Sequence, residues 1–243
     1  MTQAIRRQKK SRKFSFYFAI GLIAIGAVTA GFMTTYIQPV LGSGIDVPAV
    51  VHLHGAFSFA WIVLFFMQTV AVKSLNFKLH QRMGVAALAA AVGIVLTLLP
   101  VGLFQVRKEI ALGYGESAIS AIVGIVTTGI MFSILVALGF RYRRKPKVHK
   151  RLMLLATIII LWPAWFRFRH YFPSVPRPDI WFAVVLADSL ILVSWIADKI
   201  RYGRIHPVLL YGGLIIMAEH CLEVWLFDSA PWRIVANGIY GMF

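Results

Sequence analysis

The sequence predicts an all-α polytopic membrane protein with seven transmembrane helices. Of its 243 residues, 59% are hydrophobic and only 14% are charged, whereas soluble domains average about 25% charged residues. The apolar residues gather in blocks of about 20, which is the length that an α-helix needs to cross the hydrocarbon core. A transmembrane β-barrel would instead show alternating segments of about ten residues. These observations assign the chain to the helical membrane class.

The chain divides into three parts along its length. A basic tail covers residues 1–13, a transmembrane domain covers 14–227, and the remaining 228–243 are too short to span and are expected to lie in the membrane interface. The predicted spans are 14–37, 48–72, 83–104, 117–140, 152–170, 180–197 and 207–227. Seven crossings place the two termini on opposite sides of the membrane.

The distribution of basic residues predicts the orientation. The chain carries 25 Lys and Arg against 9 Asp and Glu, a formal net charge of +16. In a soluble protein this charge would indicate nucleic-acid binding, but here 19 of the 25 bases lie in 1–13, 73–82, 141–151 and 199–204, at span ends on one side. Such bases set topology and face anionic lipid. We therefore expect a bacterial inner-membrane protein with a cytoplasmic N-terminus, a periplasmic C-terminus and no nucleic-acid partner.

Ionisable side chains inside the predicted spans indicate where a functional site lies. A charged side chain at the membrane centre costs about 2.5–3.5 kcal/mol on insertion scales, so such a group is a functional candidate. Six of these groups, from spans two, six and seven, are predicted at overlapping depth below the periplasmic surface: His52, His54, Asp188, Glu219, His220 and Glu223. His52 and His54 point about 200° apart on a regular helix, so only one of them can face a common centre. We expect these residues to supply the ligands of a metal or haem site, with no catalytic residue assigned.

Three interpretations of this cluster stay open. Imidazole and carboxylate together suit zinc, copper or non-haem iron. A b-type haem would take two axial histidines, one from span two and His220 opposite. In the third interpretation Arg167 and Arg169 pair with the acids. In the first two, Arg167, Arg169 and His170, which close span five on the same side, supply nearby charge or bind an anionic substrate or a haem propionate.

Three further histidines lie where spans begin on the cytoplasmic side. The pattern apolar-His-polar-Arg-apolar occurs at 79–83 and again at 148–152, each time entering an outward-going span. His206 stands at the matching place before span seven. His80, His149 and His206 therefore form a second, inner candidate site. The alternative is that they are interfacial residues near lipid phosphates.

Two motifs carry a resemblance over roughly residues 50–165. The first is His52-x-His54-Gly55 with Trp61 and Gln68 downstream, and the second is His149-Lys150-Arg151-Leu152-Met153, which opens span five. Together they resemble an uncharacterised family of bacterial multi-pass membrane proteins with H-x-H-G and H-[KR]-R-[LM] motifs. This resemblance implies the fold class and no activity.

Two other resemblances concern the last span. His206 and His220 are 14 residues apart, which resembles the histidine spacing of membrane b-type cytochromes and ferric-reductase-like proteins. Seven spans with the N-terminus inside also resemble the zinc hydrolases related to ceramidases and adiponectin receptors. Those enzymes hold zinc largely through histidines, including a pair one turn apart on the last span, where this chain has Glu219-His220-x-x-Glu223.

These observations leave three classes of function. The leading hypothesis is a metal- or haem-dependent membrane oxidoreductase that acts on a lipid-soluble substrate or quinone reached from the bilayer. The second is a zinc hydrolase, in which a carboxylate activates metal-bound water. The third is a non-enzymatic transporter, or a structural or assembly subunit of a membrane complex, whose buried charges are ion pairs or a proton relay. Broken helices would favour transport, and Trp162-Pro163 in span five is the one candidate kink.

Overall fold

The computed structural model of the protein describes residues 15–42, 44 and 46–243. The basic tail predicted at 1–13 lies outside the described residues. Within them the chain is helical and has no strand, and seven helices are long and apolar enough to cross a membrane. This confirms the predicted all-α class with seven helices of membrane-spanning length, and the orientation of the termini stays a prediction.

Three of the seven spans are single unbroken α-helices of moderate length, and a fourth is much longer. The three are α3 (Ala49–Lys73), α5 (Ser117–Arg141) and α10 (Pro207–Leu226). The long helix is α4 (Phe77–Ala111), which begins six residues before the predicted span and continues seven beyond it. It begins early because the Asn76 side chain accepts a hydrogen bond from the Leu79 backbone N–H (3.0 Å), which caps the helix.

The other three spans are interrupted, and they contain shorter elements. The first consists of α1 (Phe16–Phe32), the π-helix η1 (Met33–Ile37) and α2 (Gln38–Leu41). The fifth consists of α6 (Pro146–Ile160), α7 (Trp162–Phe166) and the 3₁₀-helix η2 (Arg167–His170). The sixth consists of α8 (Pro178–Ile180), the π-helix η3 (Trp181–Leu186) and α9 (Ala187–Tyr202). A last helix, α11 (Ala230–Tyr240), follows α10.

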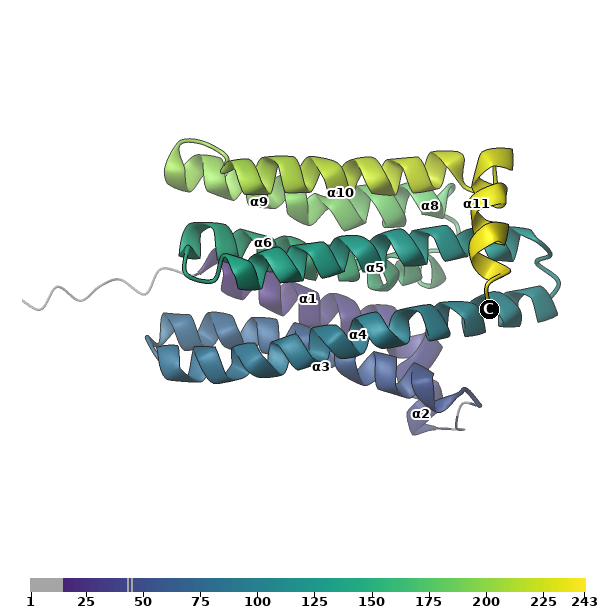
Figure 1. Ribbon diagram of the computed structural model, residues 1–243, viewed down its shortest axis with the longest axis horizontal. Helices are drawn as coiled ribbons and strands as arrows, with labels where there is room; N and C mark the ends of the chain where they lie inside the picture. The colour runs from purple at the N-terminus through teal and green to yellow at the C-terminus, as the bar shows by residue number, and fades with distance from the viewer. Residues whose placement is uncertain (1–14, 43, 45) are drawn as a thin grey trace, which may run out of the picture.

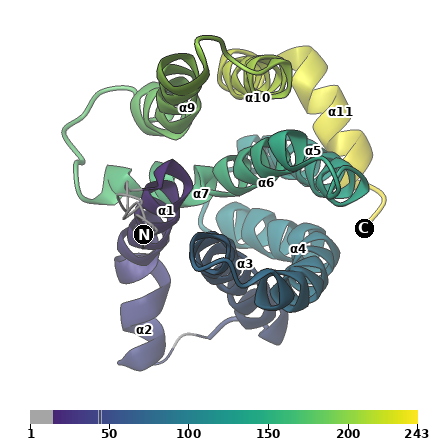
Figure 2. The same cartoon turned by 90° about the vertical axis from the view of Figure 1, so that its left-hand side faces the viewer.

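The helices stack in three layers. Figure 2 shows α9 and α10 on one side, α5, α6 and α1 in the middle, and α3 and α4 on the other side. The helix α11 crosses the end of the bundle and packs on α5, where the Trp232 indole N–H donates to the Ser120 carbonyl oxygen (2.9 Å). The predicted interfacial tail therefore contains a helix that lies across the others (Figure 1).

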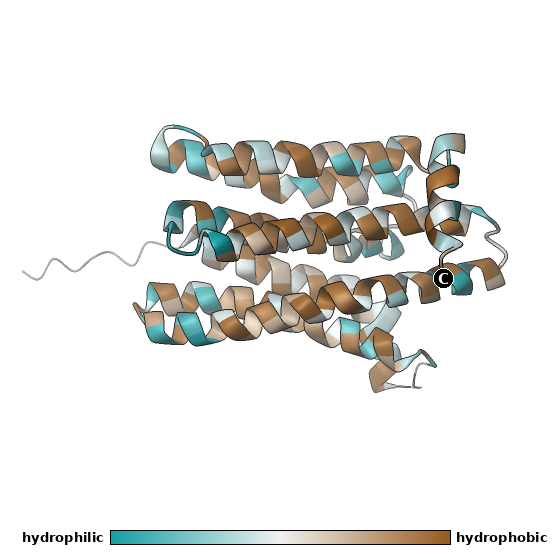
Figure 3. Ribbon diagram, in the orientation of Figure 1, coloured by the Kyte–Doolittle hydropathy of each residue, from teal (hydrophilic) through white to brown (hydrophobic). Residues whose placement is uncertain are grey.

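The two ends of the bundle differ in character. The turns 73–77, 141–146 and 202–207 lie at one end, which we call the basic end, and Figure 3 shows hydrophilic residues gathered there while the middle of the bundle is hydrophobic. The start of α1 belongs to this end, because two lysines of this end lie over its aromatic rings. The Lys150 ammonium is 5.2 Å from the centre of the Tyr17 ring, and the Lys73 ammonium is 5.1 Å from that of Phe18. The chain ends at the opposite end, where Arg107 donates to the Phe243 carbonyl oxygen (3.2 Å).

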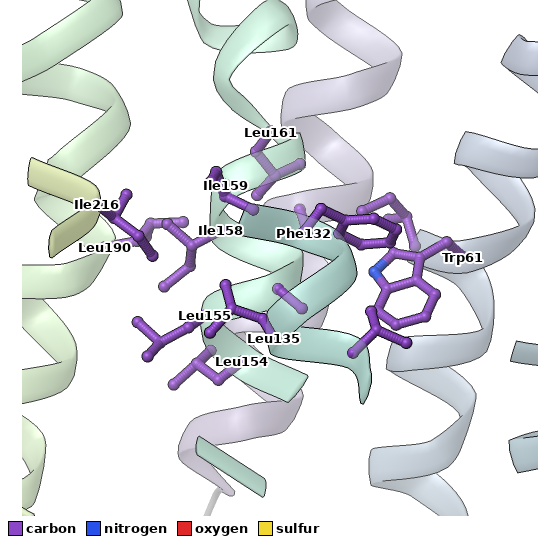
Figure 4. Packing of buried hydrophobic residues seen from close by; sticks show 14 of the residues in the cluster. Trp61, Phe132, Leu135, Leu154, Leu155, Ile158, Ile159, Leu161, Leu190 and Ile216 are labelled. Carbon is purple, nitrogen blue, oxygen red and sulfur yellow. The ribbon is translucent and has the colours of Figure 1, made fainter. Parts of the chain in front are cut away.

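The fifth span is the central helix of the bundle. In its 18-residue apolar stretch 61% of the residues are buried, compared with 17–39% in the corresponding stretches of the other six spans. Apolar side chains of α6 meet α5 and α3 on one side and α9 and α10 on the other, as Figure 4 shows for the residues around Ile158 and Leu155. The α6 helix stops at Ile160 because Pro163, in the first turn of α7, has no N–H to continue the hydrogen-bond ladder.

Candidate functional site

The strongest concentration of buried ionisable groups surrounds His220 on α10. Its imidazole is 1% exposed, and its Nδ1 lies 2.7 Å from the Oδ1 of Asp188 in the first turn of α9, a carboxylate that is also buried. The sequence analysis predicted both residues at this depth. A histidine that shares a hydrogen bond with a carboxylate keeps its second nitrogen available for another proton or ligand.

The two glutamates of α10 point at α5. The Thr127 hydroxyl donates to Glu219 Oε1 at 2.5 Å, while Glu219 Oε2 lies 3.8 Å from His220 Nε2. Glu223, one turn further on, rests against Gly124, where an added Cβ would come within 2.0 Å of its Oε1. Gly124 is therefore required for this close approach of a carboxylate to the α5 backbone. We call Asp188, Glu219, His220 and Glu223 the α10 network.

Several buried polar atoms of this region have no hydrogen-bond partner. They are Asp188 Oδ2, Glu219 Oε2, His220 Nε2 and the indole nitrogen of Trp162, whose ring centroid lies 6.5 Å from that of His220. Buried unpaired polar atoms are rare in folded proteins, so four in one place need an explanation. No Lys or Arg forms an ion pair with these acids within the described part of the chain. Neutralising three carboxylates beside one imidazole therefore requires protons or a bound cation.

Two helix interruptions adjoin the α10 network. The π-helix η3 ends at Leu186, two residues before Asp188, and the break between α6 and α7 falls at Leu161, next to Trp162. Short π-helical segments inside helices often occur at functional sites. The break falls one residue before Trp162-Pro163, the candidate kink that the sequence predicts.

His52 and His54 lie elsewhere in the bundle. His52 Nδ1 is 2.7 Å from the Tyr36 hydroxyl of η1, and His54 Nδ1 is 2.9 Å from the Thr97 hydroxyl of α4. Both histidines belong to α3, which Figure 2 places across the α5–α6 layer from α10. The structure thus brings Asp188, the α10 acids and His220 together, and it gives His52 and His54 separate partners.

The basic residues of η2 do not meet the acids. Arg167 donates to the Pro163 carbonyl oxygen (2.8 Å) and to the Thr35 hydroxyl (3.3 Å). Arg169 donates to the Phe166 carbonyl oxygen (3.0 Å) and stacks on that ring, while His170 is exposed. These arginines leave the negative charge of the α10 network uncompensated.

The inner histidines divide into a pair and a single residue. The rings of His80 and His149 lie next to each other and nearly perpendicular, with centroids 6.3 Å apart. His206 instead caps α10, because its Nδ1 accepts from the Val208 backbone N–H (3.2 Å) and its own N–H donates to Asp198 Oδ2 (3.1 Å). Burial lowers the pKa of the His206 imidazole, and the nearby Arg151 cation lowers it further.

The sequence alone does not indicate the partners of several predicted residues or one buried ion pair. Arg151, which was interpreted as a topology signal, pairs with Asp198 through two hydrogen bonds of 2.6 and 2.8 Å. Asp198 lies one residue past the predicted end of span six. The one signal in the sequence for this pair is an acid at a span end on the same side of the membrane as the basic segment 141–151. Thr97 and Thr127 were missed because an uncharged hydroxyl does not stand out inside an apolar span.

The donor set for a metal ion is incomplete in the described residues. No group of three or more His, Cys, Asp and Glu side chains is arranged there to hold a metal ion. The best fragment is His220 Nε2 with Glu219 Oε2, two unpartnered atoms 3.8 Å apart. Cys221 is exposed and free.

An apolar groove opens on the bundle surface beside η3. It has a volume of about 680 Å³ and is lined by Phe172, Val175, Pro176, Trp181, Phe182, Val185, Leu186 and Ser189. Ser189 directly follows Asp188 in α9, so the groove and the α10 network share one stretch of helix. In a membrane this groove would face lipid tails or a lipid-soluble molecule.

The described residues form an all-helical bundle with seven helices long and apolar enough to span a membrane and with an ionisable cluster inside it. No protein-family model matches the chain, and no match was found among curated proteins or among solved structures.

Proposed function

We propose that this protein is a membrane transport protein that carries protons through the α10 network. The observation that supports the proposal is the buried Asp188–His220 hydrogen bond beside Glu219, with an unpartnered atom left on each of the three side chains. Ionisable residues inside membrane spans commonly form proton relays. The proposal includes a cytoplasmic basic end and a location in the bacterial inner membrane, which the distribution of Lys and Arg supports.

The position of the imidazole suits proton transfer between two carboxylates. His220 Nδ1 bonds to Asp188 at 2.7 Å, and His220 Nε2 faces Glu219 Oε2 at 3.8 Å. A neutral imidazole that accepts a proton on one nitrogen can release another from the opposite nitrogen. Glu219 and Glu223 lie one turn apart along α10, so the relay has a further acid on the side away from the basic end.

An apolar layer separates the α10 network from the basic end. Ile158, Ile191 and Ile216, each no more than 1% exposed, come from α6, α9 and α10 on the basic-end side of the acids. Protons therefore need a rearrangement of helices to cross this layer. The interrupted helices beside the network supply places for such a rearrangement, as in transporters whose broken helices line the binding site.

A second candidate function rests on the same imidazole. Metal-ligating histidines usually hold their other ring nitrogen against a carboxylate, as His220 does with Asp188. His220 and Glu219 would then be two ligands of a zinc, copper or iron ion, and the apolar groove would admit a quinone or lipid substrate for redox chemistry or hydrolysis. A haem between His220 and His52 or His54 stays a prediction without a supporting contact.

Proton flux into liposomes tests the transport proposal. The purified chain is reconstituted with an internal pH-sensitive dye, and a potassium diffusion potential drives protons inward. We expect Asp188→Asn, Glu219→Gln and His220→Gln each to reduce the flux at least tenfold. Glu109→Gln is the matched control, since this carboxylate lies on the bundle surface and accepts a hydrogen bond from the Gln105 side chain (2.7 Å).

Two results would contradict the transport proposal. Equal flux in the parent chain and the three variants would show that protons cross elsewhere or leak through the lipid. Absence of flux, together with one zinc, copper or iron ion per chain that His220→Gln removes, would favour the metal-dependent enzyme.

A further inference from the structure

A second polar cluster lies at the basic end, away from the α10 network. His80 is in the first turns of α4 and His149 is in the first turn of α6. Their rings are nearly perpendicular, with an interplanar angle of 89° and a centroid separation of 6.3 Å. Both residues are half-buried, so part of each side chain is exposed near this end of the bundle.

The contacts of each ring leave one nitrogen without a hydrogen bond. His149 Nδ1 donates to the Gly139 carbonyl oxygen at 2.8 Å, so the neutral ring presents Nε2 as a lone pair. His80 Nδ1 is buried and has no partner, and the Gln68 backbone lies beside the same ring. A ring nitrogen fixed by a backbone carbonyl, with the other nitrogen free, is the usual arrangement of a metal-ligating histidine.

Gln68 adds a third atom of the same kind. Its side-chain oxygen is buried and has no partner. Its amide nitrogen lies beside Gly84, one turn after His80 on α4, at 3.7 Å from where a Cβ would be. The amide therefore lies over the same face of α4 as the His80 ring. The cluster thus offers two imidazole nitrogens and an amide oxygen as acceptors, and the Gln68 amide NH2 is its donor group.

Unpartnered acceptors that outnumber the donor groups around them are complementary to a cation. Imidazole ligands suit copper, zinc, nickel and iron, whereas calcium and magnesium prefer sets made only of oxygen. We propose that His80, His149 and Gln68 bind one transition-metal ion of the copper or zinc class at the basic end. This site is separate from the proposed proton pathway and goes beyond it.

Copper binding to the full-length chain tests the proposal. The detergent-purified protein is stripped with a chelator and titrated with Cu²⁺, and electron paramagnetic resonance reports the nitrogen ligands. We expect one tight equivalent per chain, with coupling from two imidazole nitrogens. His80→Gln and His149→Gln should each weaken the apparent affinity at least tenfold and remove one nitrogen from the spectrum, and Gln68→Leu should weaken it less.

His206→Asn is the matched control. It removes a third histidine from the same end of the bundle, and asparagine preserves the cap of α10. Copper binding should be unchanged in this variant. Circular dichroism and thermal unfolding of each variant without metal show whether the fold is retained, and Gln68→Leu provides a measurement that leaves both histidines in place.

Three outcomes would overturn the metal site. They are binding that survives both His80→Gln and His149→Gln, binding that only His220→Gln removes, and a Soret absorption that assigns the histidine pair to haem. Proton flux is measured on the same variants. If copper binding fails while flux still depends on Asp188 and His220, the metal site is rejected and the transport proposal stands.

Discussion

Asp198→Asn perturbs the buried ion pair that joins α6 to α9. The Arg151 and Asp198 side chains are 3% and 7% exposed, and the guanidinium donates to both carboxylate oxygens. Removing one partner of a buried pair costs about 3–5 kcal/mol, because the remaining charge stays buried without compensation. Arg151 keeps its hydrogen bond to the Lys147 carbonyl oxygen (2.7 Å), and the oxygen of the new amide can still accept another. We therefore expect a loss near the lower end, about 3 kcal/mol in the free energy of unfolding.

Reversible unfolding in mixed detergent micelles measures this loss. Arg151→Met added to Asp198→Asn should recover most of it, because the double variant no longer buries an unpaired charge. Asp179→Asn is the matched control, since its partner Arg177 is 64% exposed and surface pairs contribute about 0–1 kcal/mol. A loss below about 1 kcal/mol for Asp198→Asn, or strictly additive effects in the double variant, would refute the reasoning.

Two further predictions concern α1 and the tail. In Gly31→Ala the new Cβ would lie 2.4 Å from the Ala164 carbonyl oxygen, so we expect a loss of about 1–3 kcal/mol, whereas Gly26→Ala has nothing within 4 Å and should be neutral or stabilising by up to about 1 kcal/mol. Chemical unfolding of both variants checks this, and equal stabilities would contradict it. The hydrogen bond from Arg233 lowers the pKa of Asp228, so the pair stabilises the fold above the ordinary Asp pKa of about 3.9 and this contribution disappears as pH falls through the lowered value. The unfolding temperature of Asp228→Asn should therefore lie below that of the parent chain at neutral pH and approach it in acid. A difference in unfolding temperature that persists in acid would show that the pair is not its cause.

The membrane spans could be predicted from the sequence because hydrocarbon thickness sets their length. The helix Pro207–Leu226 matches the predicted 207–227 almost to the residue. The long α4 was underestimated because its ends are polar residues that hydropathy assigns to loops, although Asn76 gives a local capping signal. Pro100 lies inside α4 without ending it, as prolines within membrane helices often do.

The candidate site could be predicted only in part, because depth along a helix is a local property and pairing between helices is not. Counting residues placed Asp188 and His220 at similar depth, and they are hydrogen-bonded. The same count placed His54 at that depth, but its partner is Thr97 on the neighbouring helix. Which helices are neighbours depends on packing around α6, and no spacing within one span encodes that arrangement.

The break at Leu161 divides the central span into two mechanically distinct parts. The α6 half is bonded to α9 at the basic end through Arg151, and the α7 half packs against α1 where Gly31 contacts Ala164. Bending at this joint would move the Trp162 indole relative to His220 while the His149 ring stayed in place. Events at the two ends of one helix would thus be insulated from each other, so the proposed metal site would keep its geometry while the proposed proton pathway rearranges.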